Sequence, residues 1–155
     1  MTQATLTIRD AQTADVEDLL RIEQRAFSGD LLTRRALRYL ISRAHGIGLV
    51  CTVGDQPVGY AIVLLRRGSR SGRIYSLAVD PDWRGRQIGR LLLEAIETRL
   101  AAKGISRVQL EVRADNEPAL RRYHGLGYEV YASEPGYYED GEGALKMRKE
   151  LAEVP

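Results

Sequence analysis

The chain has 155 residues, enough for one domain with a sizeable hydrophobic core. Hydrophobic residues make up 44% of it and charged residues 28%, which is ordinary for a globular protein, and the formal net charge of +2 is too small to indicate a nucleic-acid partner. No apolar run approaches the roughly 20 residues of a membrane span, and the N-terminus lacks the features of a signal peptide. We therefore expect a single domain over residues 1–155, in the cytoplasm, with neither membrane nor nucleic acid as partner.

The cysteine and the histidines of the chain do not indicate a catalytic nucleophile or a metal site. The one cysteine, Cys51, lies in the apolar run IGLVCTV, so we expect a buried structural thiol and a reducing compartment. His45 and His124 have no partner at a metal-ligand spacing, so no metal site is predicted. The chain has no G-x-S-x-G motif, which leaves a hydrolase triad without its nucleophile. Arginine greatly outnumbers lysine, so a scattered arginine carries little weight.

The N-terminal half reads as a strand, two helices and then three strands. The first helix is amphipathic with Thr13 as its N-cap, and the turn GDQP joins the second and third strands into an antiparallel hairpin. Strands are expected at residues 5–11, 47–53, 58–67 and 73–80, and helices at 13–27 and 32–44.

The C-terminal half alternates helices with strands and ends in a strand that follows a turn. A helix is expected at 88–102 and ends at Gly104, and a second at 116–127. Strands are expected at 106–114 and 128–133, with a last strand inside 136–151. With no repeat and no linker, the order predicts a mixed sheet with helices on both faces, an α/β fold in the broad sense that includes α+β.

The stretch WRGRQIGRLLLEAI, residues 83–96, places three arginines at the start of a leucine-rich helix. A helix N-terminus carries about half a positive charge, so Arg84, Arg86 and Arg90 are badly placed there unless an anion joins them. Free backbone amides and the helix dipole make such a terminus an anion site. Neither a Walker A motif nor G-x-G-x-x-G is present, and a solvated basic helix start is the plain alternative.

This stretch resembles the acetyl-CoA pyrophosphate loop of the GNAT N-acetyltransferases, [Q/R]-x-x-G-x-[G/A], with Arg84 first and Gly89 last. The preceding IYSLAVDPDW matches the family's strand and turn. Gln87 stands where the family has glycine: a positive φ there would be costly, whereas a place in the helical first turn would leave its amide well oriented.

The resemblance implies a seven-stranded, mostly antiparallel sheet that is splayed near its middle, with about four helices on both faces, and acetyl-CoA as the cofactor. The implied contacts to the pantetheine arm and acetyl carbonyl use strand backbone next to a bulge, at Leu77, Ala78 and Val79. The remaining implied cofactor contacts are Arg84, Gly85, Arg86, Gln87, Ile88, Gly89, Arg90, Asn116 and Tyr123.

LEVRADNEPALRRYHGLGYEV, residues 110–130, is similar to the corresponding segment of RimI-type N-terminal protein acetyltransferases. The resemblance implies that Glu111 is the general base and Tyr123 the general acid. A glutamate, with a pKa of about 4.3, is a poor base for lysine near 10.4 but suits, through water, an α-amine near 8. A tyrosine suits protonation of a thiolate with a pKa near 8.5. The alternatives are a strand-end carboxylate for Glu111, an aromatic plug for Tyr123 and an N-cap for Asn116.

In this family the acceptor enters between the loop after the first helix and the loop before the last strand. These loops carry the implied substrate residues Phe27, Asp30, Leu31, Tyr137 and Tyr138. The acidic residues Asp30, Glu139, Asp140 and Glu142 would attract a cation, although tyrosines also favour strands and D-G favours turns.

The expected function is therefore transfer of acetyl from acetyl-CoA directly to an amine, with a peptide α-amine as the favoured acceptor and a monomer or homodimer as the active form. A small amine such as a polyamine or amino acid, or a protein lysine, stays open as acceptor. A CoA-binding sensor without catalysis also stays open, because Gln87 and Gly143 depart from the family pattern.

Overall fold

The computed structural model describes residues 5–27, 29 and 31–151. Within these residues, seven strands join one sheet in the order β1-β2-β3-β4-β5-β7-β6. The strands are β1 (Leu6–Asp10), β2 (Gly46–Val53), β3 (Gln56–Leu65), β4 (Ser71–Val79), β5 (Arg107–Arg113), β6 (Glu129–Glu134) and β7 (Ala144–Glu150). The helices are α1 (Val16–Ala26), α2 (Arg34–Ser42), α3 (Ile88–Ala102) and α4 (Glu117–Gly125), with short 3-10 turns η1 (Thr13–Asp15) and η2 (Pro81–Trp83).

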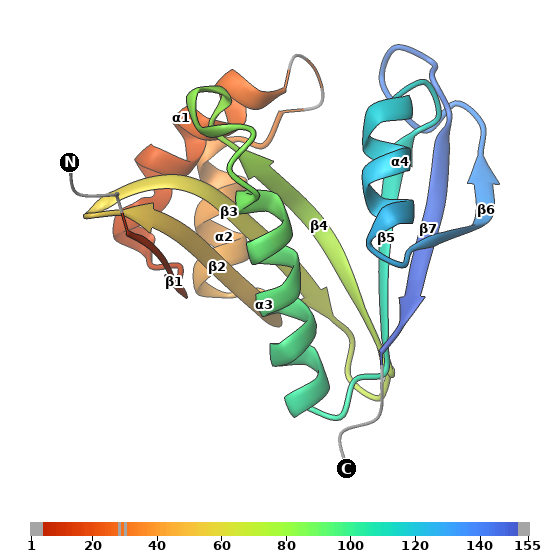
Figure 1. Cartoon of the computed structure of the whole chain (residues 1–155), viewed down its shortest axis with the longest axis horizontal. Helices are drawn as coiled ribbons and strands as arrows, with labels where there is room; N and C mark the ends of the chain where they lie inside the picture. Colours follow the sequence, from red (N-terminus) through yellow and green to blue (C-terminus); the bar gives the residue numbers. More distant parts are fainter. Residues whose placement is uncertain (1–4, 28, 30, 152–155) are drawn as a thin grey trace.

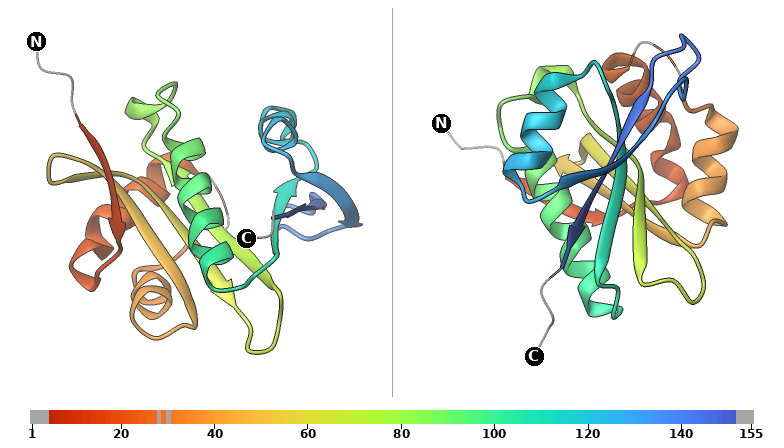
Figure 2. Two further views of the ribbon diagram at one scale, coloured as in Figure 1. Left: turned by 60° about the horizontal axis from the view of Figure 1, so that its bottom comes forward. Right: turned by 90° about the vertical axis from the view of Figure 1, so that its right-hand side faces the viewer.

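The predicted α/β class and element order are confirmed. Figure 2 shows α3 and α4 on one face of the sheet and α1 and α2 on the other. All neighbouring strands are antiparallel except β4 and β5. The helix α3 spans the predicted 88–102, and Gly104 follows it with a φ of +78°, as a C-terminal glycine should.

The first helix begins differently from the prediction. Thr13 is not its N-cap, because residues 13–15 form the 3-10 turn η1 before α1 starts. The buried Asp15 carboxylate accepts a hydrogen bond from the Gln12 amide at 2.7 Å and two from the Arg9 guanidinium at 2.8 Å. An ion pair from β1, rather than a threonine hydroxyl, therefore fixes this helix entry.

The sheet is splayed between β4 and β5, as the family resemblance implies. Their parallel pairing covers only residues 71–73 against 107–109, and beyond it the two strands diverge (Figure 1). The β3–β4 register slips by one residue between Ile74 and Ser76, so Tyr75 forms a bulge. Past residue 73, the edge of β4 that faces β5 therefore has no strand partner for its backbone groups.

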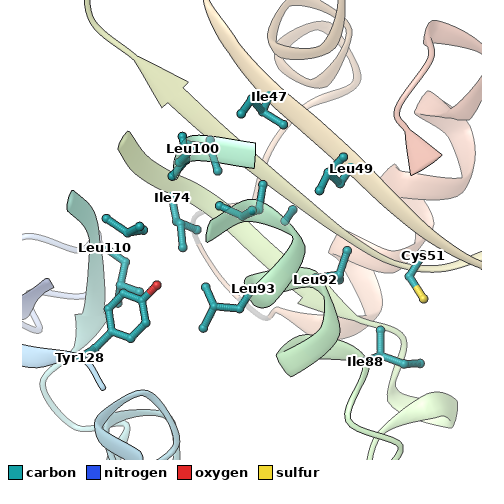
Figure 3. Close-up of a cluster of buried hydrophobic side chains, with 14 of the residues drawn as sticks. Ile47, Leu49, Cys51, Ile74, Ile88, Leu92, Leu93, Leu100, Leu110 and Tyr128 are labelled. Atoms are coloured by element: carbon teal, nitrogen blue, oxygen red, sulfur yellow. The ribbon is translucent and has the colours of Figure 1, made fainter. Parts of the chain in front are cut away.

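Two hydrophobic cores hold the helices to the sheet. On the α3 face, Leu92, Leu93 and Leu100 belong to the same cluster as Leu49 of β2 and Leu110 of β5 (Figure 3). A smaller core on the other face joins α1 and α2 to β2, β3 and β4.

Polar contacts on the α3 face connect the two halves of the splayed sheet. The Tyr128 hydroxyl donates to Glu97 of α3 at 2.8 Å, and the Lys149 ammonium on β7 lies 2.9 Å from the same carboxylate. These contacts link α3, which packs on β2, β3 and β4, to residues on the other side of the splay.

Candidate active site

The loop before α3 has the backbone of an anion site. Gly85 has a φ of +79°, and Gln87, the N-cap residue of α3, lies in the left-handed region with φ +61° and ψ +23°. The first hydrogen bond of α3 runs from Leu91 to Gln87, which leaves the amides of residues 88–90 without a partner in the helix. Gln87 thus adopts the positive φ that glycine supplies in the family's motif.

The arginines of this loop are exposed, and the first turn of α3 carries no acidic residue. Arg86 stacks on Trp83, with its guanidinium carbon 4.6 Å from the ring centroid. Arg90 pairs with Glu94 at 2.9 Å and donates to the Gln87 side chain at 3.3 Å. Because each guanidinium is accessible to solvent, the three free amides and the arginines can together receive a large anion.

Several of the predicted cofactor residues pack their side chains into the two hydrophobic cores. Ile88 is 1% exposed and packs in the α3-side core, so only its backbone can face a ligand. Leu77 and Val79 point to the same core, whereas Ala78 points to the α1 side. An added Cβ at Gly89 would lie 3.8 Å from the side chains of Leu77 and Val79, which is ordinary contact and places the loop against the end of β4.

Glu111 lies on the face of β5 that is opposite to α3. Leu110 and Val112 on either side of it are buried in the α3-side core, and the Glu111 side chain is 17% exposed. Arg73 of β4 donates from Nε to both Glu111 oxygens, at 3.1 and 3.2 Å, and from Nη2 to the Tyr137 hydroxyl at 3.1 Å. One arginine therefore joins β4, β5 and the loop between β6 and β7.

Arg73 is a candidate site residue that the sequence did not indicate. In the sequence it resembles the chain's many other arginines, and no motif contains it. Only the register of β4 on β5, which pairs Arg73 with Gln109, brings its side chain next to Glu111.

Tyr123 lies on α4 and packs against the α3-side core, edge-on to Tyr128 with ring centroids 5.9 Å apart. Burial raises the pKa of its hydroxyl above the ordinary value, so the group stays protonated at neutral pH. No hydrogen bond joins this hydroxyl to another residue in the described part of the chain. Tyr123 and Glu111 thus approach the splayed strands from opposite faces of the sheet.

Asn116 is the N-cap of α4, and its Oδ1 accepts a hydrogen bond from the Ala119 amide at 3.2 Å. The capping alternative for this residue is therefore confirmed. Its Nδ2 group donates no hydrogen bond among the described residues and is free to bind a ligand.

The loop between β6 and β7 is held by Arg113. Its guanidinium donates to Asp140 at 2.6 Å, also pairs with Asp115, and lies 4.9 Å from the centre of the Tyr138 ring. The hydrogen bond from Arg113 holds the pKa of Asp140 below its usual range. Arg113 therefore already pairs with Asp140, one of the four acidic residues expected from the sequence to attract a cation.

The connection between α1 and α2 lies beside the end of β4. Phe27 and Leu31 are exposed, at 39% and 42%, while predicted Asp30 lies outside the described residues. The buried Glu23 accepts a hydrogen bond from the Leu32 amide at 2.9 Å. At the end of α1, Arg25 pairs with Asp80 at 2.7 Å, which ties this connection to the turn before the anion loop.

A splayed mixed sheet with an arginine-rich helix N-terminus beside the splay is the architecture of an acetyl-CoA-dependent N-acetyltransferase. The chain belongs to the acetyltransferase (GNAT) family, which matches residues 14–128. Acetyl-CoA is the acetyl donor of this family, and the enzyme is an acyltransferase. No helix in the described ranges is long and apolar enough to cross a membrane.

The chain is 30% identical over 142 residues to the [ribosomal protein bS18]-alanine N-acetyltransferase of Salmonella typhimurium. The alignment covers 88% of this chain and 90% of that enzyme. An uncharacterised Mycobacterium leprae protein is 33% identical over 142 residues, but the chain spans only 38% of that longer protein. The crystal structure of the Escherichia coli ribosomal-protein-S18-alanine N-acetyltransferase superimposes with a TM-score of 0.88 at 27% identity, over 97% of both chains.

Proposed function

We propose that this enzyme acetylates the N-terminal α-amine of a protein or peptide by direct transfer from acetyl-CoA. The observation that carries the proposal is the Arg73–Glu111 ion pair on the face opposite to Tyr123, because it offers a carboxylate to the acceptor without leaving a net negative charge. The similarity to the alanine N-acetyltransferases supports the same acceptor. A cytoplasmic location belongs to the proposal and is supported by the free, buried thiol of Cys51.

The proposed catalytic roles follow from what the transfer requires. Bound acetyl-CoA supplies an activated thioester whose thiol leaves as a thiolate with a pKa of about 8.5. Glu111, as the general base, accepts the proton of the acceptor amine through water. Tyr123, as the general acid, donates to the thiolate, and its raised pKa keeps the proton available until then.

The ease of deprotonation favours an α-amine. At pH 7 an α-amine with a pKa near 8 needs about 1.4 kcal/mol to become neutral, whereas a lysine with a pKa near 10.4 needs about 4.6 kcal/mol. A carboxylate that is already paired with an arginine contributes little to the deprotonation of a lysine. The site therefore suits the α-amine, which is the weaker base.

We assign the cofactor's pyrophosphate to the free amides of residues 88–90 together with Arg84 and Arg86, with Gly85 and Gln87 shaping the loop. The unpaired β4 edge at Leu77, Ala78 and Val79 is assigned to its pantetheine arm, and Asn116 is proposed as a further contact. Support comes from the positive φ values at 85 and 87 and from the register, which leaves this edge without a strand partner.

The acceptor is proposed to lie between Phe27 and Leu31 on one side and Tyr137 and Tyr138 on the other. A polyamine, which needs several unpaired carboxylates, fits less well, because Arg113 and Arg73 already pair with Asp140 and Glu111. The presence of a candidate base, Glu111, and a candidate acid, Tyr123, on opposite faces of the splayed sheet argues against a CoA sensor without catalysis.

The test compares three acceptors in steady-state assays: a peptide with a free N-terminus, the same peptide N-blocked but with one lysine, and spermidine. We expect the free N-terminus to be acetylated fastest. Glu111→Gln and Tyr123→Phe should each lower kcat by about 10²- to 10⁴-fold. Acetyl-CoA binding, measured by calorimetry, should stay within about threefold, and Arg107→Gln, which removes a pair with Glu150, serves as a control on the same face of β5. Full turnover in both variants would contradict the roles of Glu111 as general base and Tyr123 as general acid. A preference for spermidine would contradict the proposed α-amine acceptor.

A further inference from the structure

Arg73 is fixed at the point where the sheet opens. It occupies the last paired position of β4, and its guanidinium carbon lies 5.7 Å from the ring centre of Tyr75, the bulge residue. With the two contacts to Glu111 and one to Tyr137, this leaves Nη1 as the uncommitted nitrogen among the described contacts. The side chain is 41% exposed, so a positive charge faces the acceptor side of the splay.

We propose that Arg73 is a specificity-determining residue that selects α-amines over lysine side chains and polyamines. This inference rests on the proposed function, since it concerns the same acceptor site. Arg73 holds the Glu111 carboxylate and the Tyr137 hydroxyl in one hydrogen-bonded unit and presents a fixed cation where the amine must approach Glu111. A second cation is disfavoured beside a fixed one, so the acceptor binds as the neutral amine.

Selection by charge follows from the acceptors' own chemistry. At pH 7 about 10% of an α-amine with a pKa near 8 is neutral, and the neutral fraction of a lysine near 10.4 is about 250-fold smaller. A site that accepts only the neutral form inherits this ratio. A site with an unpaired carboxylate would instead bind the ammonium form of either amine. Such a site would not show this ratio.

The other charged groups around Arg73 do not cancel its effect. The residue opposite Glu111 on β7 is Lys146, which pairs with Glu134 of β6 at 3.3 Å. Arg73 pairs with Glu111 and Lys146 pairs with Glu134, so neither of these two carboxylates is left unpaired to hold an ammonium group. The β6–β7 loop contributes the Tyr137 hydroxyl, which accepts from Arg73.

The test uses Arg73→Met, which keeps the length of the side chain without its charge, and Arg73→Lys, which keeps the charge without the planar fork. The control is Arg107→Met, which removes a comparable arginine on β5 that pairs with Glu150 at 2.6 Å. Each variant is assayed with a lysine-free peptide bearing a free N-terminus and with an N-blocked peptide bearing one lysine. Thermal unfolding of each variant measures any loss of fold.

We expect kcat/KM of the wild type to favour the α-amine by at least 100-fold. Arg73→Met should reduce this ratio tenfold or more, and Arg73→Lys and Arg107→Met should keep it within about threefold. An equal loss of kcat/KM on both acceptors in Arg73→Met would overturn the proposal, because it would assign Arg73 a purely structural part.

A second measurement does not depend on turnover. Binding of the free-N-terminal peptide to the enzyme saturated with CoA is followed by calorimetry from pH 6 to pH 9. The wild type should bind more tightly as pH rises, because the neutral amine is selected, and Arg73→Met should show a flatter profile. A flat wild-type profile, or no peptide binding, overturns the selection by charge. Absent turnover of either peptide by the wild type would refute the proposed function alone, since the binding profile still decides the role of Arg73.

Discussion

Replacing Gln87 with glycine should stabilise this protein. A residue with a side chain costs about 1–2 kcal/mol in the left-handed region that Gln87 occupies, with φ +61° and ψ +23°. Glycine removes that cost but loses about 0.5–1 kcal/mol through its greater freedom in the unfolded chain. The exposed 3.3 Å hydrogen bond from Arg90 to the Gln87 side chain is long and contributes little. The net gain is about 0.5–1 kcal/mol, or a rise in Tm of about 1–4 °C.

The assay is urea unfolding at 25 °C together with calorimetric melting of wild type, Gln87→Gly and two controls. Gln87→Ala keeps the backbone cost and should be neutral or slightly destabilising. Gly85→Ala creates the same kind of cost at φ +79°, where an added Cβ meets no atom within 4 Å. After the same offset for the reduced freedom of the unfolded chain, it should lose about 0.5–1 kcal/mol through the backbone alone. A Gln87→Gly variant that is less stable than the wild type would contradict a backbone cost at residue 87.

The same variant tests whether Gln87 impairs the cofactor loop. The left-handed backbone is already in place, so the free amides of residues 88–90 should keep their orientation in Gln87→Gly. Acetyl-CoA affinity should then stay within about threefold of the wild type. A gain of more than tenfold would mean that the glutamine side chain obstructs the loop.

Two further predictions concern charged pairs. Asp15→Asn should cost about 1–3 kcal/mol at pH 7, because the Asp15 carboxylate accepts charge-assisted hydrogen bonds from Arg9. Those bonds lower the pKa of Asp15 in the folded state, so its contribution is present above the unfolded value of about 3.9 and is lost as pH falls through the lower folded value. The difference between variant and wild type in urea unfolding should shrink below about pH 4, and a difference constant with pH would contradict this. Arg113→Gln should raise KM for a peptide acceptor several-fold, because Asp140 and its loop are released, while acetyl-CoA affinity stays unchanged; an unaltered KM in steady-state kinetics would contradict the assigned role of that loop.

Much of the fold could be read from local patterns. The period of apolar residues placed α3, and the glycine after it marked its end, because both depend on neighbours in the chain. The arginine-rich helix start indicated the candidate anion site for the same reason. For Gln87 the sequence left two backbone conformations open, since the cost of a left-handed residue depends on the surrounding loop rather than on the residue alone.

Charge pairing was the part that the sequence could not supply. Asp140 lies 27 residues from Arg113, and Glu111 lies 38 residues from Arg73. Their pairing depends on which strands are neighbours and in what register, and a shift of one residue would turn these side chains to the other face. The sequence therefore could not show that Asp140 and Glu111 each already have an arginine partner in the fold.

The acceptor of this enzyme can be determined by locating the acetyl group on one peptide that carries both kinds of amine. A peptide with a free N-terminal alanine and one internal lysine is incubated with enzyme and acetyl-CoA at pH 7, and the product is sequenced by tandem mass spectrometry. We expect a single acetyl group on the N-terminal amine. An acetyl group on the lysine, or an unmodified peptide, would contradict it.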